Sequence, residues 1–179
     1  LYTKYFRALI EYEGIHRTET FEYPEAAVRE ALLNAVAHKD YSGSAPIQIS
    51  VYKEKIMIWN QGELPKNWTV EDLTTKHPSI PFNPDIANAF FRSGYIEAWG
   101  RGFSEMTKAC LDRGLPEPVY KFESSGFWVN FRKDIYNKSY LELLGLSGRQ
   151  VKAVLFVKEK GQINNSEYQK LNKVSKATA

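Results

Sequence analysis

Two polar side chains, Glu30 and Asn34, stand among the apolar residues of the stretch "REALLNAVAHKDY" at residues 29–41. A spacing of four residues places both on one face of a helix, and His38 continues the same stripe. Burying a carboxylate or an amide is costly unless something compensates. A carboxylate here can orient a water as a general base, and an amide oxygen can ligate Mg²⁺. Taken alone, the stripe is more typical of a helix whose polar face meets solvent.

Two glycine motifs downstream suit close approach to an anionic ligand. "IMIWNQGELP" runs from a predicted strand into a turn at Gly62, and "EAWGRGFSEM" places Gly100 and Gly102 directly before a predicted helix. Glycine allows close backbone approach, and a helix N-terminus offers unpaired N–H groups to phosphate. Each motif alone is also typical of a simple turn. The ordered set is more specific: E-x-x-x-N on a helix, N-x-G after a strand, then G-x-G before another helix.

The elements that must position these residues predict a domain of the α+β class. Pro24 suits the first turn of a helix that runs to about Lys39. Alternating apolar residues predict strands in the regions around it. The expected elements are a lead-in with helical spacing at 3–13, a strand at 15–23, an antiparallel pair at 46–54 and 55–60, short helices at 69–73 and 83–94, a helix at 102–114 and a hairpin at 118–134.

After Asp134 the chain changes to short helices with a basic surface. From Arg132 onward there are ten Lys/Arg against four Asp/Glu, a net of +6, whereas residues 1–131 carry a net of −3. Two helices are expected, at 148–161 and 164–174, the second with a capping box from Ser166 to Gln169, and Ser175 would cap a third. Helix, turn, helix, turn and helix start is the plan of a DNA-binding helix-turn-helix. A solvated three-helix unit is an equally good interpretation of this pattern.

The motifs together resemble the ATP-binding fold shared by DNA gyrase B, the MutL repair proteins, histidine kinases and related chaperones, the GHKL or Bergerat fold. More closely, "YPEAAVREALLNAVAHKDYS", "IWNQGELP", "HPSIPFNPDIANAFFRSGYIEAWGRG" and "ACLDRGLPEP" resemble the family labelled ATP-dependent DNA helicase RecG-related, C-terminal. Its members are commonly described as transcriptional regulators with an amino-terminal Schlafen/AlbA-type domain. The likeness runs from about Tyr23 to Phe131, and the tail from about Leu146 resembles the beginning of a winged helix-turn-helix.

The resemblance implies a role for each matching residue. Glu30 takes the position of the water-activating, catalytic glutamate, and Asn34 that of the asparagine that binds Mg²⁺. Asn60 stands where the wider superfamily has an aspartate that binds the adenine of ATP, and Gly62 belongs to the same motif. The other residues that the resemblance implies to bind the nucleotide are Gly100 and Gly102 in the second glycine box and His38 and Lys39 in the H-[RK]-D-Y signature. Both motifs are expected on the phosphate side.

The implied organisation is a lead-in at 1–14, a two-layer α/β sandwich of GHKL type at 15–133, and an incomplete winged helix-turn-helix at 134–179. The implied DNA contacts are Lys170, Lys173, Ser175 and Lys176. ATP with Mg²⁺ would bias the arrangement of domains, or of a homodimer, in a DNA-binding regulator. Two departures, Asn60 in place of aspartate and Leu64 in place of a second glycine, leave two alternatives. These are a weak ATPase with Glu30 as general base and a degenerate scaffold that binds no nucleotide.

Several classes of protein are not expected. The chain has no G-x-x-x-x-G-K-[ST] phosphate loop and no acidic Walker-B-like strand end, so a helicase motor is excluded despite the family's label. A single cysteine, Cys110, excludes a disulfide framework and a cysteine-based zinc site. No apolar run approaches the length of a membrane span and no leader opens the chain. The expectation is a cytoplasmic protein with no membrane partner.

Overall fold

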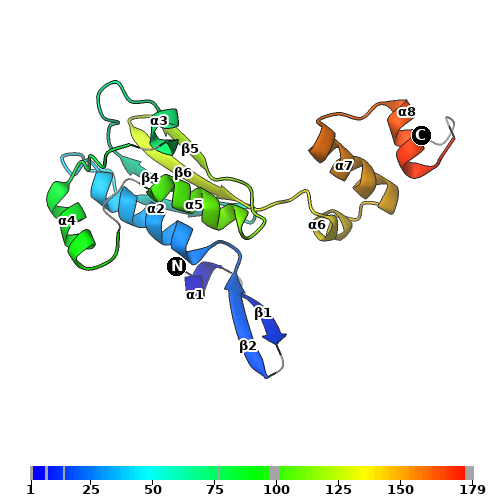
Figure 1. Ribbon diagram of the computed structural model, residues 1–179, viewed down its shortest axis with the longest axis horizontal. Helices are drawn as coiled ribbons and strands as arrows, with labels where there is room; N and C mark the ends of the chain where they lie inside the picture. Colours follow the sequence, from blue (N-terminus) through cyan, green and yellow to red (C-terminus); the bar gives the residue numbers. More distant parts are fainter. Residues whose placement is uncertain (1, 7, 14, 76, 97–100, 176–179) are drawn as a thin grey trace. The chain divides into compact units, whose positions relative to one another are not determined.

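The chain forms two compact units, Leu1–Lys133 and Asp134–Ala179 (Figure 1). The computed structural model describes residues 2–6, 8–13, 15–75, 77–96 and 101–175. Both helices and antiparallel strands are present, in agreement with the predicted α+β class. Each unit is described below by itself.

The first unit is built on a four-stranded antiparallel sheet with the strand order β3-β4-β6-β5. Its strands are β3 (Gln48–Val51), β4 (Lys55–Gln61), β5 (Val119–Glu123) and β6 (Gly126–Arg132). Both hairpins predicted from the alternating pattern are present, and β4 joins them by pairing along its whole length with β6. Because side chains alternate between the faces of a strand, the order of residues along β4 decides what faces the helices.

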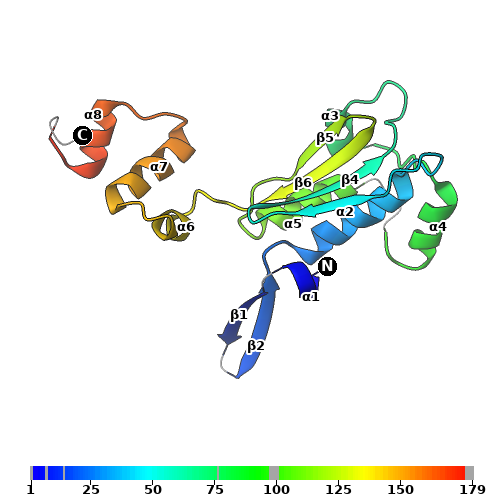
Figure 2. The ribbon, with the colours of Figure 1, turned by 180° about the vertical axis from the view of Figure 1, so that it is seen from behind.

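Helices α2 (Glu25–His38) and α5 (Gly102–Leu111) lie side by side on one face of this sheet (Figures 1 and 2). The core between helices and sheet contains Val28, Ala31, Ala35, Ile56, Ile58, Met106, Cys110, Val129 and Phe131. Ile56 and Ile58 occupy alternate positions of β4, so Asn60 is the next side chain on the core-facing side. Burial raises the pKa of the Cys110 thiol to about 11, which fits a packed thiol rather than a nucleophile.

Two shorter helices complete this part of the unit. Helix α3 (Val70–Thr74) begins with a capping box between Thr69 and Asp72. Helix α4 (Pro84–Arg92) starts at a proline, and none of its residues is buried. The segment between the two helices contains Pro78 and Pro81, and its described residues adopt neither helix nor strand.

The amino-terminal segment differs from the expected helical lead-in. Among the described residues of this segment, the helical ones are those of α1 (Tyr2–Tyr5). Strand β1 (Ala8–Glu13) pairs antiparallel with β2 (His16–Phe21), in a register that runs from Ala8 opposite Phe21 to Glu13 opposite His16. The helical spacing predicted over 3–13 is therefore wrong for residues 8–13. These residues are extended because they pair with a second strand, and the spacing of apolar residues along one segment does not predict such pairing.

The second unit contains α6 (Lys138–Leu143), α7 (Gly148–Lys160) and α8 (Asn165–Asn172). Leu141 and Val151 are buried within it, and Lys158 forms an ion pair of 2.6 Å with Asp134. The capping box predicted from Ser166 to Gln169 is wrong. Asn164 is the N-cap of α8, and its side chain and that of Glu167 bond reciprocally to each other's backbone N–H.

Candidate functional site

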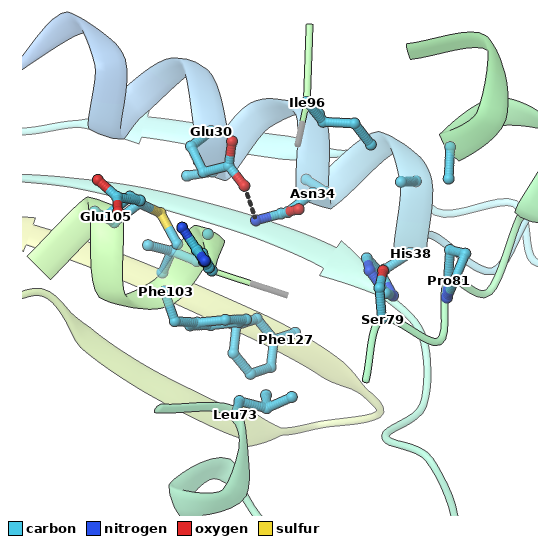
Figure 3. A pocket seen from close by; sticks show the side chains of 18 of the residues that line it. Glu30, Asn34, His38, Leu73, Ser79, Pro81, Ile96, Phe103, Glu105 and Phe127 are labelled. Atoms are coloured by element: carbon cyan, nitrogen blue, oxygen red, sulfur yellow. Dashed lines mark hydrogen bonds between the residues drawn. The ribbon is translucent and has the colours of Figure 1, made fainter. Parts of the chain in front are cut away.

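A cavity of about 540 Å³ lies beside α2 in the first unit (Figure 3). Its walls come from α2, the end of β4, the segment 77–81, the first turns of α5 and the facing side of β6. The volume falls within the range of about 300–1,000 Å³ that is usual for small-molecule sites. A ligand in this cavity would meet the polar stripe of α2 directly.

Most of the residues singled out from the sequence line this cavity. They are Glu30, Asn34, His38, Asn60, Gly62 and Gly102. Gly100 lies outside the described residues. Lys39 does not line the cavity: its ammonium donates to the carbonyl of Asp40 at 2.7 Å and lies 4.9 Å from the ring centre of Tyr41.

Glu30 and Asn34 form a bonded pair at one end of the cavity. The Asn34 Nδ2 donates to Glu30 Oε1 at 3.1 Å, and Figure 3 shows the amide oxygen on the side turned away from Glu30. Gly102, the first residue of α5, lies directly against this pair. A Cβ at Gly102 would collide with Glu30 Oε1 and lie 3.0 Å from Asn34 Nδ2. A side chain at position 102 would therefore displace the Glu30 carboxylate or α5.

The N-terminus of α5 makes this end of the cavity favourable for negative charge. A helix N-terminus carries a partial positive charge and unpaired N–H groups within its first turn. The Glu30 carboxylate already lies at this terminus, because it contacts Gly102. A phosphate at the same place would find the dipole favourable and the carboxylate unfavourable, and a cation between the two anions would offset that repulsion.

Asn60 and Gly62 lie where β4 meets the carboxyl end of α2. Asn60 is only 5% exposed, and its Nδ2 lies 3.3 Å from the carbonyl of Gln61. A Cβ at Gly62 would come within 2.7 Å of the carbonyl oxygen of His38. The strand and the helix therefore meet main chain to main chain at this glycine.

His38, the last residue of α2, lies two helical turns beyond Glu30, about 12 Å along the helix axis. Burial, and to a lesser extent the charge of His77, lower the pKa of His38. The ring of His77 lies within reach of two carbonyl oxygens, Pro78 at 2.9 Å and Leu73 at 3.2 Å. Both imidazoles line the cavity.

The sequence motifs assign no role to several aromatic residues that line the cavity, among them Phe103 and Phe127, whose ring centres are 5.7 Å apart. The indole of Trp59 does not line the cavity, because it is nearly buried over Gly126, where no Cβ would fit. The sequence signal for Phe127 was its alternation with Val129 and Phe131. In the structure Phe127 pairs with Asn60 and so shares its face of the sheet.

The amide oxygen of Asn34 fits a magnesium ion that is shared with a ligand. Across the parts of the chain that the structure describes, no three His, Cys, Asp or Glu side chains are grouped so as to hold a metal. Mg²⁺ usually takes only one or two protein oxygens and completes its shell with phosphate oxygens and waters. The amide oxygen of Asn34 supplies one donor of that kind, on the side turned away from Glu30.

Residues 44–131 match the family described as "Putative ATP-dependent DNA helicase recG C-terminal". The match supports an ATPase-like domain around the cavity. It covers β3 to β6 and includes Asn60, Gly62 and Gly102, but it starts after α2, so Glu30 and Asn34 precede it.

Among solved structures, the chain is similar to the crystal structure of the DIP2311 protein from Corynebacterium diphtheriae, with a TM-score of 0.60 and 21% sequence identity. The similarity covers 96% of this chain and 37% of that chain, so this chain spans a little over a third of that protein's length. At this identity the likeness concerns the fold. No curated protein matches the chain. None of the described helices has the length and apolar character needed to cross a bilayer.

Proposed function

We propose that the first unit binds ATP with Mg²⁺ in the cavity beside α2, within a two-layer sandwich of GHKL type. The observation that carries the proposal is that Glu30, Asn34, Asn60, Gly62 and Gly102, drawn from three separate elements and the turn after β4, line one cavity. The match of residues 44–131 to an ATPase-like family supports the same ligand.

In the proposed complex the phosphates lie at the end where α5 begins. Asn34 would ligate Mg²⁺ through its amide oxygen, and Gly102 lets the N–H groups of the first turn of α5 approach the phosphates. Bound Mg²⁺ would neutralise phosphate charge beside the Glu30 carboxylate. Gly100, which matches the second glycine box, is proposed as part of this same end.

The base lies at the opposite end in this proposal, near Asn60 and Gly62. The Asn60 amide oxygen is the group proposed to accept a hydrogen bond from the adenine amino group, and Phe127 shares its face of the sheet. His38, expected with the phosphates from the sequence, is assigned to the base end because it lies two turns from Glu30. Lys39 is left out of this proposed site, because it does not line the cavity and its ammonium donates to the carbonyl of Asp40.

Isothermal titration calorimetry of the chain with ATP, in the presence and absence of Mg²⁺, tests this proposal. We expect one site per chain, tighter with Mg²⁺ than without it. Asn34→Ala should remove the Mg²⁺ dependence, whereas Asn88→Ala, an exposed asparagine on α4, should bind as the wild type does. If no heat of binding is seen at millimolar ATP with Mg²⁺, the proposal fails and the scaffold alternative stands.

We also propose that the second unit is the beginning of a winged helix-turn-helix, in a cytoplasmic, DNA-binding regulator whose domain or homodimer arrangement responds to ATP. The support is the succession of three capped helices, α6 to α8, and the net positive charge from Arg132 onward. Lys170, Lys173 and Ser175 are exposed at the end of this unit. Lys176 and the helix expected after Ser175 lie outside the described residues.

A further inference from the structure

Asn83 connects two walls of the cavity that are distant in the sequence. Its side-chain Nδ2 donates to the carbonyl oxygens of Ala37 at 3.0 Å and Lys39 at 2.7 Å, and its backbone N–H donates to Ala37 at 2.9 Å. These acceptors lie at the carboxyl end of α2, where carbonyl groups have no partner within the helix. Three hydrogen bonds from one residue therefore join α2 to the start of α4.

The segment that precedes Asn83 forms a wall of the cavity and has little structure of its own. All five residues from His77 to Pro81 line the cavity, yet they adopt neither helix nor strand. Pro78 and Pro81 have no backbone N–H to donate. In Figure 3, Ser79 and Pro81 lie beside His38 at this end of the cavity. The position of this wall therefore depends on the anchors at its ends.

The geometry of Asn83 differs from ordinary helix capping. Asn83 occupies the N-cap position of α4, where an asparagine usually accepts a hydrogen bond from the first turn of its own helix. Its side chain makes no such bond and donates to α2 instead. At the other end of α4, the Arg29 guanidinium donates to the carbonyl of Tyr95 at 3.1 Å. None of the residues of α4 is buried, but hydrogen bonds to α2 and its C-cap hold the chain just before α4, at Asn83, and just after it, at Tyr95.

We propose that Asn83 is a positioning residue that anchors the 77–81 wall to α2 and so sets the width of the cavity at the proposed base end. The effect of Asn83 on ligand binding rests on the proposed function, whereas its hydrogen bonds to Ala37 and Lys39 do not. An anchored wall would lower the ordering cost of binding, because the segment is already held in place. Since the anchor lies at the base end, it should act equally on ATP and ADP.

Asn83→Asp separates anchoring from capping. Aspartate has nearly the same shape and is as good an N-cap as asparagine, but its carboxylate cannot donate to Ala37 or Lys39. Asn88→Asp is the matched control, because it makes the same change at an exposed position on the same helix. Asn83→Ala, which removes the donor without adding charge, serves as the second variant if Asn83→Asp does not fold.

Two measurements test the proposal. Without nucleotide, the protection against exchange of the backbone amide at position 83, which donates to the carbonyl oxygen of Ala37, should fall in Asn83→Asp by about thirtyfold, because two hydrogen bonds of about 1 kcal/mol each are lost. The affinities for Mg²⁺-ATP and Mg²⁺-ADP should fall together by about tenfold, so that their ratio is unchanged. Asn88→Asp should change neither quantity.

The outcomes are distinguishable. Unchanged protection of the backbone amide at position 83 would overturn the anchor, whatever happens to affinity. Faster exchange with unchanged affinity, or a changed ratio of ATP to ADP affinity, would overturn the positioning role. If the wild-type chain binds no nucleotide, the proposed function and the positioning role are overturned together, and the exchange result then concerns the anchor alone.

Discussion

The amide of Asn34 donates to the carboxylate of Glu30 over 3.1 Å, so the two polar residues of α2 form a bonded pair within the helix. The pair fixes the direction of both groups. Because the Asn34 nitrogen is used by Glu30, its oxygen is the atom that remains for a ligand. A metal bound by Asn34 would therefore lie on the side of the amide that is turned away from the Glu30 carboxylate.

Glu30→Gln tests whether the carboxylate acts as a general base. We expect ATP affinity to stay within about threefold, because the amide keeps the shape and removes a negative charge beside the phosphates. A phosphate-release rate above background in the wild type should be abolished in the variant. Glu25→Gln, at an exposed position in the first turn of the same helix, is the control and should leave the rate unchanged. An equal rate in wild type and Glu30→Gln would show that Glu30 is not the base.

Gly102→Ala tests the close contact between α5 and the Glu30–Asn34 pair. The new methyl group would collide with Glu30 Oε1, so either the carboxylate or α5 must move. We expect a loss of about 1–3 kcal/mol in the free energy of unfolding and weaker ATP binding. Urea unfolding and calorimetry measure the two effects. Gly148→Ala, also at the first position of a helix but with open space around it, should not destabilise; an equal effect of both substitutions would contradict the contact.

His38 should make stability depend on pH. Burial and the charge of His77 lower its pKa below the ordinary value of 6.5, so the unfolded chain binds more protons than the folded chain below that pH. The contribution of His38 is complete above pH 6.5 and is lost as the pH falls toward the lowered pKa. Urea unfolding between pH 5 and pH 7.5 should therefore show a decline in stability on acidification that is smaller in His38→Gln. Parallel curves for the two proteins would contradict this prediction.

The basic end of the second unit should bind DNA through phosphates. Replacing Lys170 and Lys173 together with alanine should weaken binding by a similar factor for different DNA sequences, and should reduce the slope of log affinity against log salt by about 2. Lys66→Ala, an exposed lysine in the first unit, should have no effect. Fluorescence anisotropy over a series of salt concentrations measures both quantities. An unchanged slope would show that these lysines do not contact phosphate.

Local sequence patterns predicted the elements that carry most of the candidate site. The alternation of Ile56 and Ile58 places Asn60 on the core-facing side of β4, and the spacing of Glu30 and Asn34 places them side by side on α2. Both follow from the geometry of a single strand or helix. The chemistry proposed at these positions rests on the resemblance of their motifs to the GHKL fold.

The features that the sequence did not predict depend mostly on contacts between distant segments. Asn83 is 46 residues from Ala37, and nothing in its neighbourhood indicates that its side chain would point to α2 rather than cap α4. Residues 8–13 are a strand because they pair with β2. At the start of α8, Asn164 and Ser166 both suit an N-cap, and sequence alone does not decide between positions two residues apart.

The meeting of Gly62 with the carbonyl of His38 has a consequence for redesign of the cavity. At Gly62 the wall of the cavity is main chain, so a side chain introduced there would push against the end of α2 and would not reshape the lining of the cavity. A change of ligand preference is better sought at Asn60 and along 77–81, where side chains line the cavity. The width of the cavity is therefore set by the backbone at the end near Gly62, whereas the side chains of the neighbouring 77–81 wall can be changed.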